Sequence, residues 1–329
     1  MSDGPHLVVA GSYGWSTRYV LAAAPGPGET LLADEVQFEH GGKGSNQAVA
    51  AARLGASVDF VTAVGHDHPG EAAIALWQGE GVRADPVRPA GLPTMTGTIL
   101  VERDGENRIV VALGAMLALG ATDAHLVGRL VTADSTVVVQ NEAPYPFTRA
   151  VLERAAAAGA RTVYNPAPVS AALDHSDPVW QAVDVLVPNQ HEARSLLGDS
   201  DLAPDASAEE LAPELAERTG CRVVLTLGAE GAVFAAGGAV ERVPAVPATA
   251  VDTTGAGDCF TAALSVALAE GAVMRDAVRF ACLAASRAVQ QPGVIEGLPR
   301  RAELAEEVVG NQREWIAEFG RSVIPRLRR

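Results

Sequence analysis

Lysine is almost absent from this sequence. Lys43 is its one lysine, so nearly all of the 25 basic side chains are arginines, and 40 acidic residues give a formal net charge of −15. A surface this negative repels a phosphate backbone, so we expect no nucleic acid partner. A small anion such as a nucleotide is not excluded, because a local nest of backbone N–H groups can outweigh the overall field.

Cysteine and long apolar runs are scarce too. Three cysteines, Cys221, Cys259 and Cys282, lie far apart and are odd in number, which favours neither a disulfide framework nor a zinc cluster. No run of about 18 uncharged apolar residues is present, so we expect no membrane span. No basic stretch precedes the first apolar run, which argues against a signal peptide. Together these absences predict a cytoplasmic protein in a reducing environment.

Strand-like and helix-like segments alternate through most of the 329 residues. Strands are expected at 6–12, 58–64, 135–140, 161–165, 183–189 and 221–228. Helices are expected at 45–56, 70–82, 255–271 and 274–291. Such alternation predicts a three-layer αβα sandwich with a mostly parallel central sheet. Segments 13–37 and 95–112 are β-rich and break the alternation, so we interpret 1–329 as one domain with these segments as a small β-sheet lid.

A glycine-rich turn opens the apolar helix that begins near residue 256. It reads Asp252-Thr-Thr-Gly-Ala-Gly-Asp258. Unpaired N–H groups at a helix N-terminus, together with the helix dipole, form a site suited to phosphate. A carboxylate in that first turn, Asp258, can accept a proton from an attacking hydroxyl. By itself this motif is equally compatible with a glycine turn whose acidic residue stabilises the helix start.

A second loop leads into a helix at 40–47, His-Gly-Gly-Lys-Gly-Ser-Asn-Gln. Its glycines permit close approach of a ligand, Asn46 offers donor and acceptor groups for hydroxyls, and Lys43 supplies a mobile positive charge. The Walker spacing is missing. A Rossmann dehydrogenase is also disfavoured, because no G-x-G-x-x-G follows the first strand.

Together the two motifs resemble the two signatures of the ribokinase (PfkB) family of carbohydrate kinases. Further matches lie between them in the family's order: Thr96-Gly97, Gly105-Glu106-Asn107, Glu142, Asn165-Pro-Ala-Pro168, Pro188-Asn189-x-x-Glu192 and Thr226-Leu-Gly228. The resemblance covers residues 6–300. It implies an ATP-dependent kinase that phosphorylates a hydroxyl of a sugar or a sugar-like compound.

The resemblance also implies a role for each matching residue. Asp258 is implied as the catalytic base, which also contacts the substrate. The backbone of Gly255, Ala256 and Gly257 is implied as the anion hole for the γ-phosphoryl group, with Gly257 also at the ATP. The implied sugar contacts are Gly42, Lys43, Asn46 and Glu142.

For the nucleotide and its ions, the resemblance implies six further positions. Asn189 and Glu192 would organise magnesium and the ATP phosphates, partly through water. Thr226 and Gly228 would lie along the nucleotide. Asp252 and the backbone of Thr254 would form part of a potassium site beside the anion hole.

One departure concerns the substrate. Ribokinases of this family end the first strand in Gly-Ser-x-Asn-x-Asp, whose polar pair binds sugar hydroxyls, whereas this chain has Gly14 and Ser16 at those positions. Each lost polar partner can cost about 1–3 kcal/mol. We therefore expect D-ribose to be a poor substrate, with Gly14 and Ser16 still lining the pocket and Trp15 stacking on the substrate.

Two alternatives remain at this point. Gly14 makes room for a base, which would suit a nucleoside kinase of the same fold. A catalytically idle sugar-binding regulatory protein belongs to another functional class, and the intact glycine turn with Asp258 argues against it. Related lids pair across a two-fold axis, so we expect a homodimer through the lid. We interpret His66-Asp67-His68 as a loop rather than a metal site.

Overall fold

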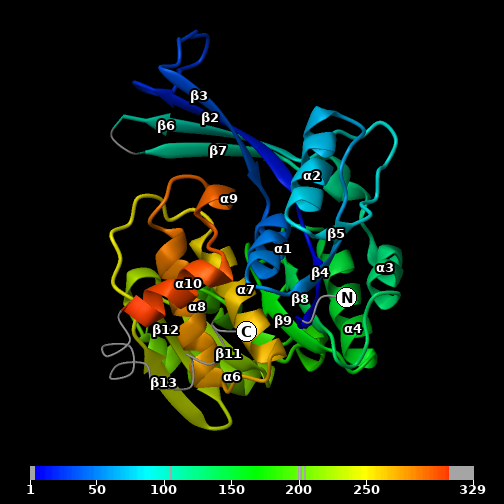
Figure 1. Cartoon of the computed structure of the whole chain (residues 1–329), viewed down its shortest axis with the longest axis vertical. Coiled ribbons are helices and arrows are strands. Elements are labelled where there is room, and N and C mark those ends of the chain that lie inside the picture. Colours follow the sequence, from blue (N-terminus) through cyan, green and yellow to red (C-terminus); the bar gives the residue numbers. More distant parts are fainter. Residues whose placement is uncertain (1–3, 104–105, 199, 201, 204, 311–329) are drawn as a thin grey trace.

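The computed structural model describes residues 4–103, 106–198, 200, 202–203 and 205–310. Gly105, in the family match Gly105-Glu106-Asn107, lies outside these residues. Two sheets organise the chain, a large one in the body and a small one above it (Figure 1). The predicted α/β class, with a mostly parallel central sheet and a second, smaller sheet, is therefore confirmed.

The large sheet has nine strands within the described residues. In spatial order they are β13 (Ala239–Val243), β12 (Ala232–Ala236), β11 (Arg222–Thr226), β10 (Val185–Leu186), β9 (Arg161–Asn165), β8 (Thr136–Gln140), β1 (His6–Ala10), β4 (Ser57–Val61) and β5 (Arg83–Ala84). The strands from β11 to β5 pair in parallel, and at one edge β12 pairs antiparallel with both β11 and β13. The carboxyl ends of the central parallel strands therefore share one edge of the sheet.

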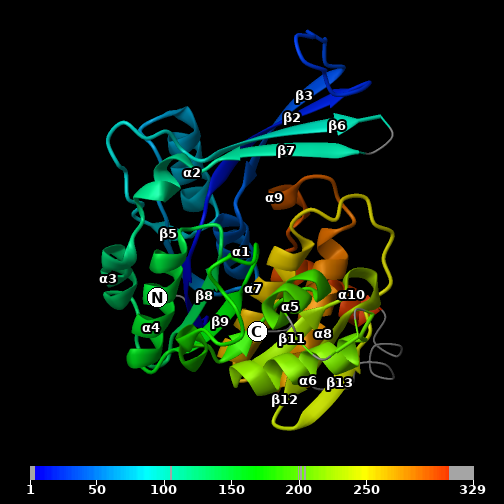
Figure 2. The ribbon, with the colours of Figure 1, turned by 180° about the vertical axis from the view of Figure 1, so that it is seen from behind.

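Helices cover both faces of this sheet (Figures 1 and 2). One face packs against α1 (Lys43–Arg53), α2 (His68–Gly79), α7 (Ala256–Ala269), α8 (Met274–Ala288) and α10 (Arg301–Gly310). The other packs against α3 (Ala124–Gly128), α4 (Tyr145–Ala157), α5 (Gln190–Leu197) and α6 (Ala208–Thr219). A four-residue helix, α9 (Val294–Gly297), follows α8. Short 3₁₀ turns lie at Gly114–Ala118, Ala121–Asp123, Pro178–Ala182 and Gly228–Glu230.

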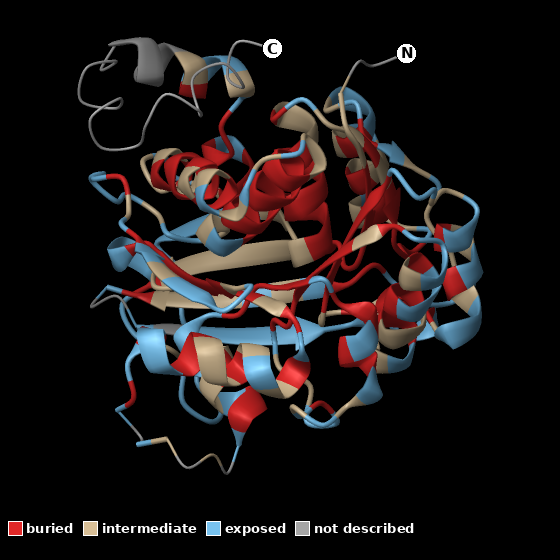
Figure 3. Ribbon diagram, turned by 90° about the horizontal axis from the view of Figure 1, so that it is seen from below, coloured by how far each residue is buried: buried red, intermediate tan, exposed pale blue. Residues whose placement is uncertain are grey.

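The core forms because the central strands are apolar on both sides. In β1, Leu7 and Val9 pack into the cluster under α1 and α7, while Val8 and Ala10 pack into the cluster under α4. Strands buried on both faces have nearly continuous apolar sequences, and for that reason these strands can be predicted from the sequence. Figure 3 shows these buried strands between the two helical layers.

The small sheet is the predicted lid, built from β3 (Glu35–Gly41), β2 (Gly14–Leu21), β6 (Thr96–Glu102) and β7 (Asn107–Ala112) in that order. It extends above the sheet edge where the central strands end (Figure 1). The predicted first lid segment stopped at residue 37, but β3 continues to Gly41. It does so because β2 and β3 pair residue for residue down to Gly14 opposite Gly41.

Candidate active site

The N-terminus of α1 packs directly against the chain that connects β1 to β2. Gly42 has φ +89°, and a Cβ added there would lie 2.6 Å from Tyr13 Cα and 2.9 Å from the Ser12 carbonyl oxygen. A Cβ added at Gly44 would lie 2.6 Å from the Ser12 nitrogen. Only glycine permits both contacts. The two glycines thus place the first turn of α1 beside the chain that leads from β1 into the lid.

The N-terminus of α7 has a similar construction. Its N-cap residue, Gly255, has φ +77°, and a Cβ added there would lie 2.6 Å from Val294 Cγ1. A Cβ at Gly257 would meet no atom within 4 Å. The first turn of α7 therefore opens onto free space, where its N–H groups can meet an anion.

Asp258 lies in this first turn and is only 5% exposed. Two amide groups of α1 hold its carboxylate: Asn46 Nδ2 donates to Oδ2 at 2.8 Å, and Gln47 Nε2 donates to Oδ1 at 3.0 Å. Gln47 Oε1 in turn accepts from Gln140 Nε2 at 2.6 Å, at the end of β8. Hydrogen bonds from two amides stabilise the charged carboxylate and fix its orientation.

Lys43 and Glu142 lie beside Asp258. Glu142 Oε2 accepts from the Lys43 backbone N–H at 2.8 Å and from Ser12 Oγ at 2.5 Å. The Asp258 carboxylate raises the pKa of the Lys43 ammonium, burial opposes this, and the charges of Glu142 and Glu192 add to the rise. The Lys43 ammonium therefore stays charged. It interacts with three carboxylates, and it lies between the implied sugar contacts and the implied phosphate contacts.

Asn189 and Glu192 form a reciprocal cap at the start of α5. Asn189 Oδ1 accepts from the Glu192 N–H, and Glu192 Oε2 accepts from the Asn189 N–H, both at 2.8 Å. Burial raises the pKa of Glu192, opposed by that N–H and by the charge of Lys43. Glu192 Oε1 has no hydrogen bond to any described residue, so a carboxylate oxygen beside Lys43 remains suited to a hydrated divalent cation.

The two residues expected along the nucleotide lie at the end of β11 and just after it. Thr226 ends β11 and forms a parallel bridge with Asn189. Gly228 follows with φ +57°, and a Cβ there would meet no atom within 4 Å. The structure thus brings Asn189, Thr226 and Gly228 to one edge of the sheet, with an open surface at Gly228.

Asp252 precedes the glycine turn. Its Oδ1 accepts from the Thr254 N–H at 2.9 Å, and its Oδ2 accepts from the Gly293 N–H at 3.2 Å. Burial raises the pKa of Asp252, but these donors and the charge of Arg18 outweigh it, so the pKa lies below its ordinary value. The carboxylate thus ties the glycine turn to the chain before α9. Its remaining lone pairs fit a cation bound there with backbone carbonyls.

The lid presents Gly14 and Ser16 on one face and Trp15 on the other. Gly14 pairs with Gly41, and Ser16 pairs with Glu39 and Gly97. Glu39 on this face interacts electrostatically with Asp252, so it faces the body. Because side chains alternate along a strand, Trp15 lies on the face opposite that of Ser16 and Glu39.

Trp15 packs instead against aromatic rings. Its ring centroid lies 6.2 Å from that of Phe38, 5.1 Å from His40 and 5.9 Å from His68. The expectation that Trp15 stacks on a substrate is therefore not supported by its placement.

Two other conspicuous residues have structural roles. Asp67, between the two histidines, is the N-cap of α2 and accepts from Gly70 N–H at 3.0 Å and Thr94 N–H at 2.7 Å. Within the described ranges, no cluster of three or more metal-ligating side chains was found. Cys259 is fully buried, and burial holds the pKa of its thiol well above the ordinary value.

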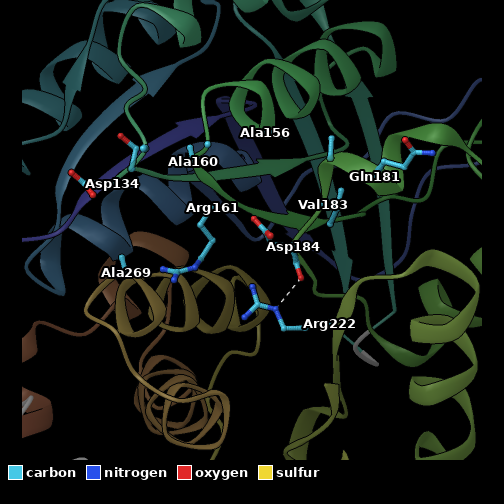
Figure 4. A pocket seen from close by; sticks show the side chains of 13 residues that line it. Asp134, Ala156, Ala160, Arg161, Gln181, Val183, Asp184, Arg222 and Ala269 are labelled. Carbon is cyan, nitrogen blue, oxygen red and sulfur yellow. Dashed lines mark hydrogen bonds between the residues drawn. The ribbon is translucent and has the colours of Figure 1, made fainter. Parts of the chain in front are cut away.

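A cavity of about 640 Å³ lies at the amino ends of the central strands, opposite the site described above (Figure 4). Arg161 and Arg222 reach into it beside Asp134 and Asp184. Arg161 Nη1 donates to the Leu268 carbonyl at 2.7 Å, at the C-terminal end of α7. A cation at a helix C-terminus stabilises the helix dipole, so this cavity has a structural explanation.

Sequence reasoning missed several buried polar residues of the site: Ser12, Gln47, Gln140 and Asn165. All four are less than 10% exposed. A signal was present, because Gln140 and Asn165 each end an otherwise apolar buried strand. A polar side chain at that point needs a buried partner.

Comparison with known proteins agrees with this geometry. The family model described as pfkB family carbohydrate kinase matches residues 10–301. Ribokinase from Bacillus subtilis is 36% identical over 308 residues, which cover 92% of this chain and 98% of that protein. The structure of Arabidopsis thaliana ribokinase complexed with ribose and ATP has a TM-score of 0.83 and 30% identity, covering 92% of this chain and 98% of that one. A nucleoside kinase from Burkholderia thailandensis in complex with inosine shares the fold, with a TM-score of 0.76, 20% identity and coverage of 93% and 96%.

Proposed function

The chain belongs to the pfkB family of carbohydrate kinases and is an ATP-dependent sugar kinase, and we propose that Asp258 is its catalytic base. The observation that carries this proposal is the position of Asp258. Its carboxylate is buried in the first turn of α7, and two amides orient it beside open space at Gly257. A base is useful only where the reacting hydroxyl and the phosphoryl group can meet.

The proposed reaction balances as a single transfer. The sugar oxygen attacks the γ-phosphorus of ATP while its proton passes to Asp258. The bond from that phosphorus to the bridging oxygen breaks, and ADP leaves with the electron pair. The backbone of Gly255, Ala256 and Gly257 forms an anion hole, because N–H groups of a helix's first turn stabilise charge that grows on the phosphoryl oxygens.

Sugar recognition is assigned to the residues around Lys43. Glu142 and Asn46 supply acceptors for hydroxyls, and Asn46 Oδ1 is buried without a hydrogen-bond partner among the described residues. Such an orphaned acceptor costs stability unless a ligand satisfies it. Gly42 lets the first turn of α1 approach the chain before β2 closely, and Gly14 and Ser16 would line the lid side of the pocket.

The nucleotide phosphates are assigned to the edge formed by Asn189, Thr226 and Gly228, with Gly257 opposite. A magnesium ion would be held near Glu192 and Asn189, partly through water, where it would neutralise phosphate charge. Asp252 and the Thr254 backbone would hold potassium, which would keep the N–H groups of the glycine turn in place. Buried thiols and the need for ATP suit a cytoplasmic location.

We also propose a homodimer through the outer lid face. Phe38 and Val110 are 65% and 71% exposed, and both lie in the row of residues across the lid that includes Thr17 and Thr98. Val36 adds a third exposed apolar side chain on this face. An exposed face that carries three apolar side chains suits a self-complementary contact across a two-fold axis.

Turnover tests the proposal. Purified protein with magnesium and ATP is offered pentoses, hexoses, polyols and nucleosides, and ADP release is measured. We expect turnover with a sugar. A nucleoside as the best substrate would instead support the nucleoside kinase alternative, and sugar binding with no turnover would support the idle regulatory protein.

A further inference from the structure

The space beside Gly14 is filled by the side chain of Met95, the residue just before β6. A Cβ added at Gly14 would lie 2.7 Å from Met95 Cε. The terminal methyl of Met95 therefore occupies the volume that a side chain at position 14 would take. Met95 is only 7% exposed, so its side chain is largely buried beside Gly14.

Met95 is held firmly in this position. Its carbonyl oxygen accepts from the Trp15 N–H at 2.9 Å. Thr94, immediately before it, donates its N–H to Asp67 at 2.7 Å, and its Oγ1 accepts from the Gly65 N–H at 2.9 Å. The backbone on both sides of the methyl is thus fixed by hydrogen bonds.

This methyl borders the proposed sugar pocket. Gly14 N would lie 2.8 Å from a Cβ at Gly42, and the next residue, Lys43, donates its N–H to Glu142. The pocket is therefore polar on the body side, where Glu142, Asn46 and Asp258 lie. On the lid side, Gly14, Gly41 and Gly97 have no side chain and Ser16 has a single hydroxyl, while Glu39, which pairs with Ser16, interacts with Arg18. The Met95 methyl therefore makes this wall apolar only at Gly14.

We propose that Met95 is a specificity-determining residue that selects a sugar lacking a hydroxyl on the side facing the lid. This inference rests on the proposed function. A hydroxyl pressed against the Met95 methyl loses its water partners and gains none, whereas a methylene is buried favourably. An apolar wall discriminates weakly, so a preference of about 10-fold for a deoxypentose is expected.

The experiment compares kcat/KM for D-ribose, 2-deoxy-D-ribose and 3-deoxy-D-ribose. The unaltered enzyme should prefer one of the deoxy sugars by about 10-fold. Met95→Gln is the test variant, because it keeps the length of the side chain and adds a polar tip; it should abolish the preference. Met95→Leu is the apolar control and should retain it.

The outcomes separate the two proposals. Preference for D-ribose over both deoxy sugars in the unaltered enzyme would overturn the role of Met95, whether or not any variant folds. An unchanged preference in a folded Met95→Gln protein would also overturn it. Failure to phosphorylate any sugar would instead refute the proposed function.

Discussion

Replacing Asp258 separates its chemical role from its structural one. In Asp258→Asn, the new Oδ1 can still accept from Gln47, whose own amide is fixed by Gln140. The new Nδ2 would face Asn46 Nδ2, but Asn46 can rotate its amide and offer Oδ1, which has no partner among the described residues. Both hydrogen bonds survive, so the free energy of unfolding should change by less than about 1 kcal/mol.

Asp258→Ala cannot be accommodated in this way. It leaves one N–H of the Asn46 amide and one of the Gln47 amide without an acceptor, at about 1–3 kcal/mol each, although Gln47 Nε2 keeps its 3.3 Å hydrogen bond to Asn165 Oδ1. The unfolding free energy should therefore fall by about 2–6 kcal/mol. In both variants kcat should fall at least ~10²-fold, because no base remains.

The assays are chemical denaturation for stability and coupled ADP release for turnover, on both variants and the unaltered protein. Near-normal kcat in Asp258→Asn would remove Asp258 from the mechanism. Equal stability of the Asn and Ala variants would show that the two amides do not clamp the carboxylate, and the reasoning from the contacts would be refuted.

Three further predictions concern the ion site, the lid and the start of α2. Activity should rise when potassium replaces a bulky organic cation at constant ionic strength; a flat response would reject the Asp252 site. Phe38→Lys should convert the dimer to a monomer in light scattering at micromolar concentration, and a monomeric unaltered protein would contradict the lid interface. Asp67→Ala should lower the unfolding free energy at pH 7 by about 1–2 kcal/mol, as loss of an N-cap does. Hydrogen bonds from Thr94 and Gly70 outweigh burial and hold the pKa of Asp67 below its ordinary value, so its contribution should be present above pH ~4 and be lost as the pH falls.

The body of the fold was predictable because its strands are buried on both faces. β1, β8 and β9 read as apolar runs, and α1 and α7 follow glycine turns whose conformations need glycine. The lid boundary was harder to place. Residues 39–41 are Glu, His and Gly, which carry weak β-propensity, and only their pairing with β2 makes them a strand.

Site residues within a sequence motif were predictable. Site residues that reach the site only through tertiary contacts were not. Asp258 and Lys43 stand in glycine-rich turns. Gln47 was overlooked as a site residue, because only the packing of α1 against α7 brings it to Asp258. The orientation of Trp15 depends on which face of β2 meets the body, and the sequence of an isolated strand does not specify that.

Formation of a phosphorylated sugar tests the central claim most directly. The unaltered protein and Asp258→Asn are incubated with magnesium, ATP and the sugar panel, and the products are identified by mass spectrometry. The account predicts a sugar monophosphate and one equivalent of ADP from the unaltered protein, with product formation at least ~10²-fold slower from Asp258→Asn. Sugar phosphate formed equally fast by both proteins, or none from the unaltered protein, would contradict it.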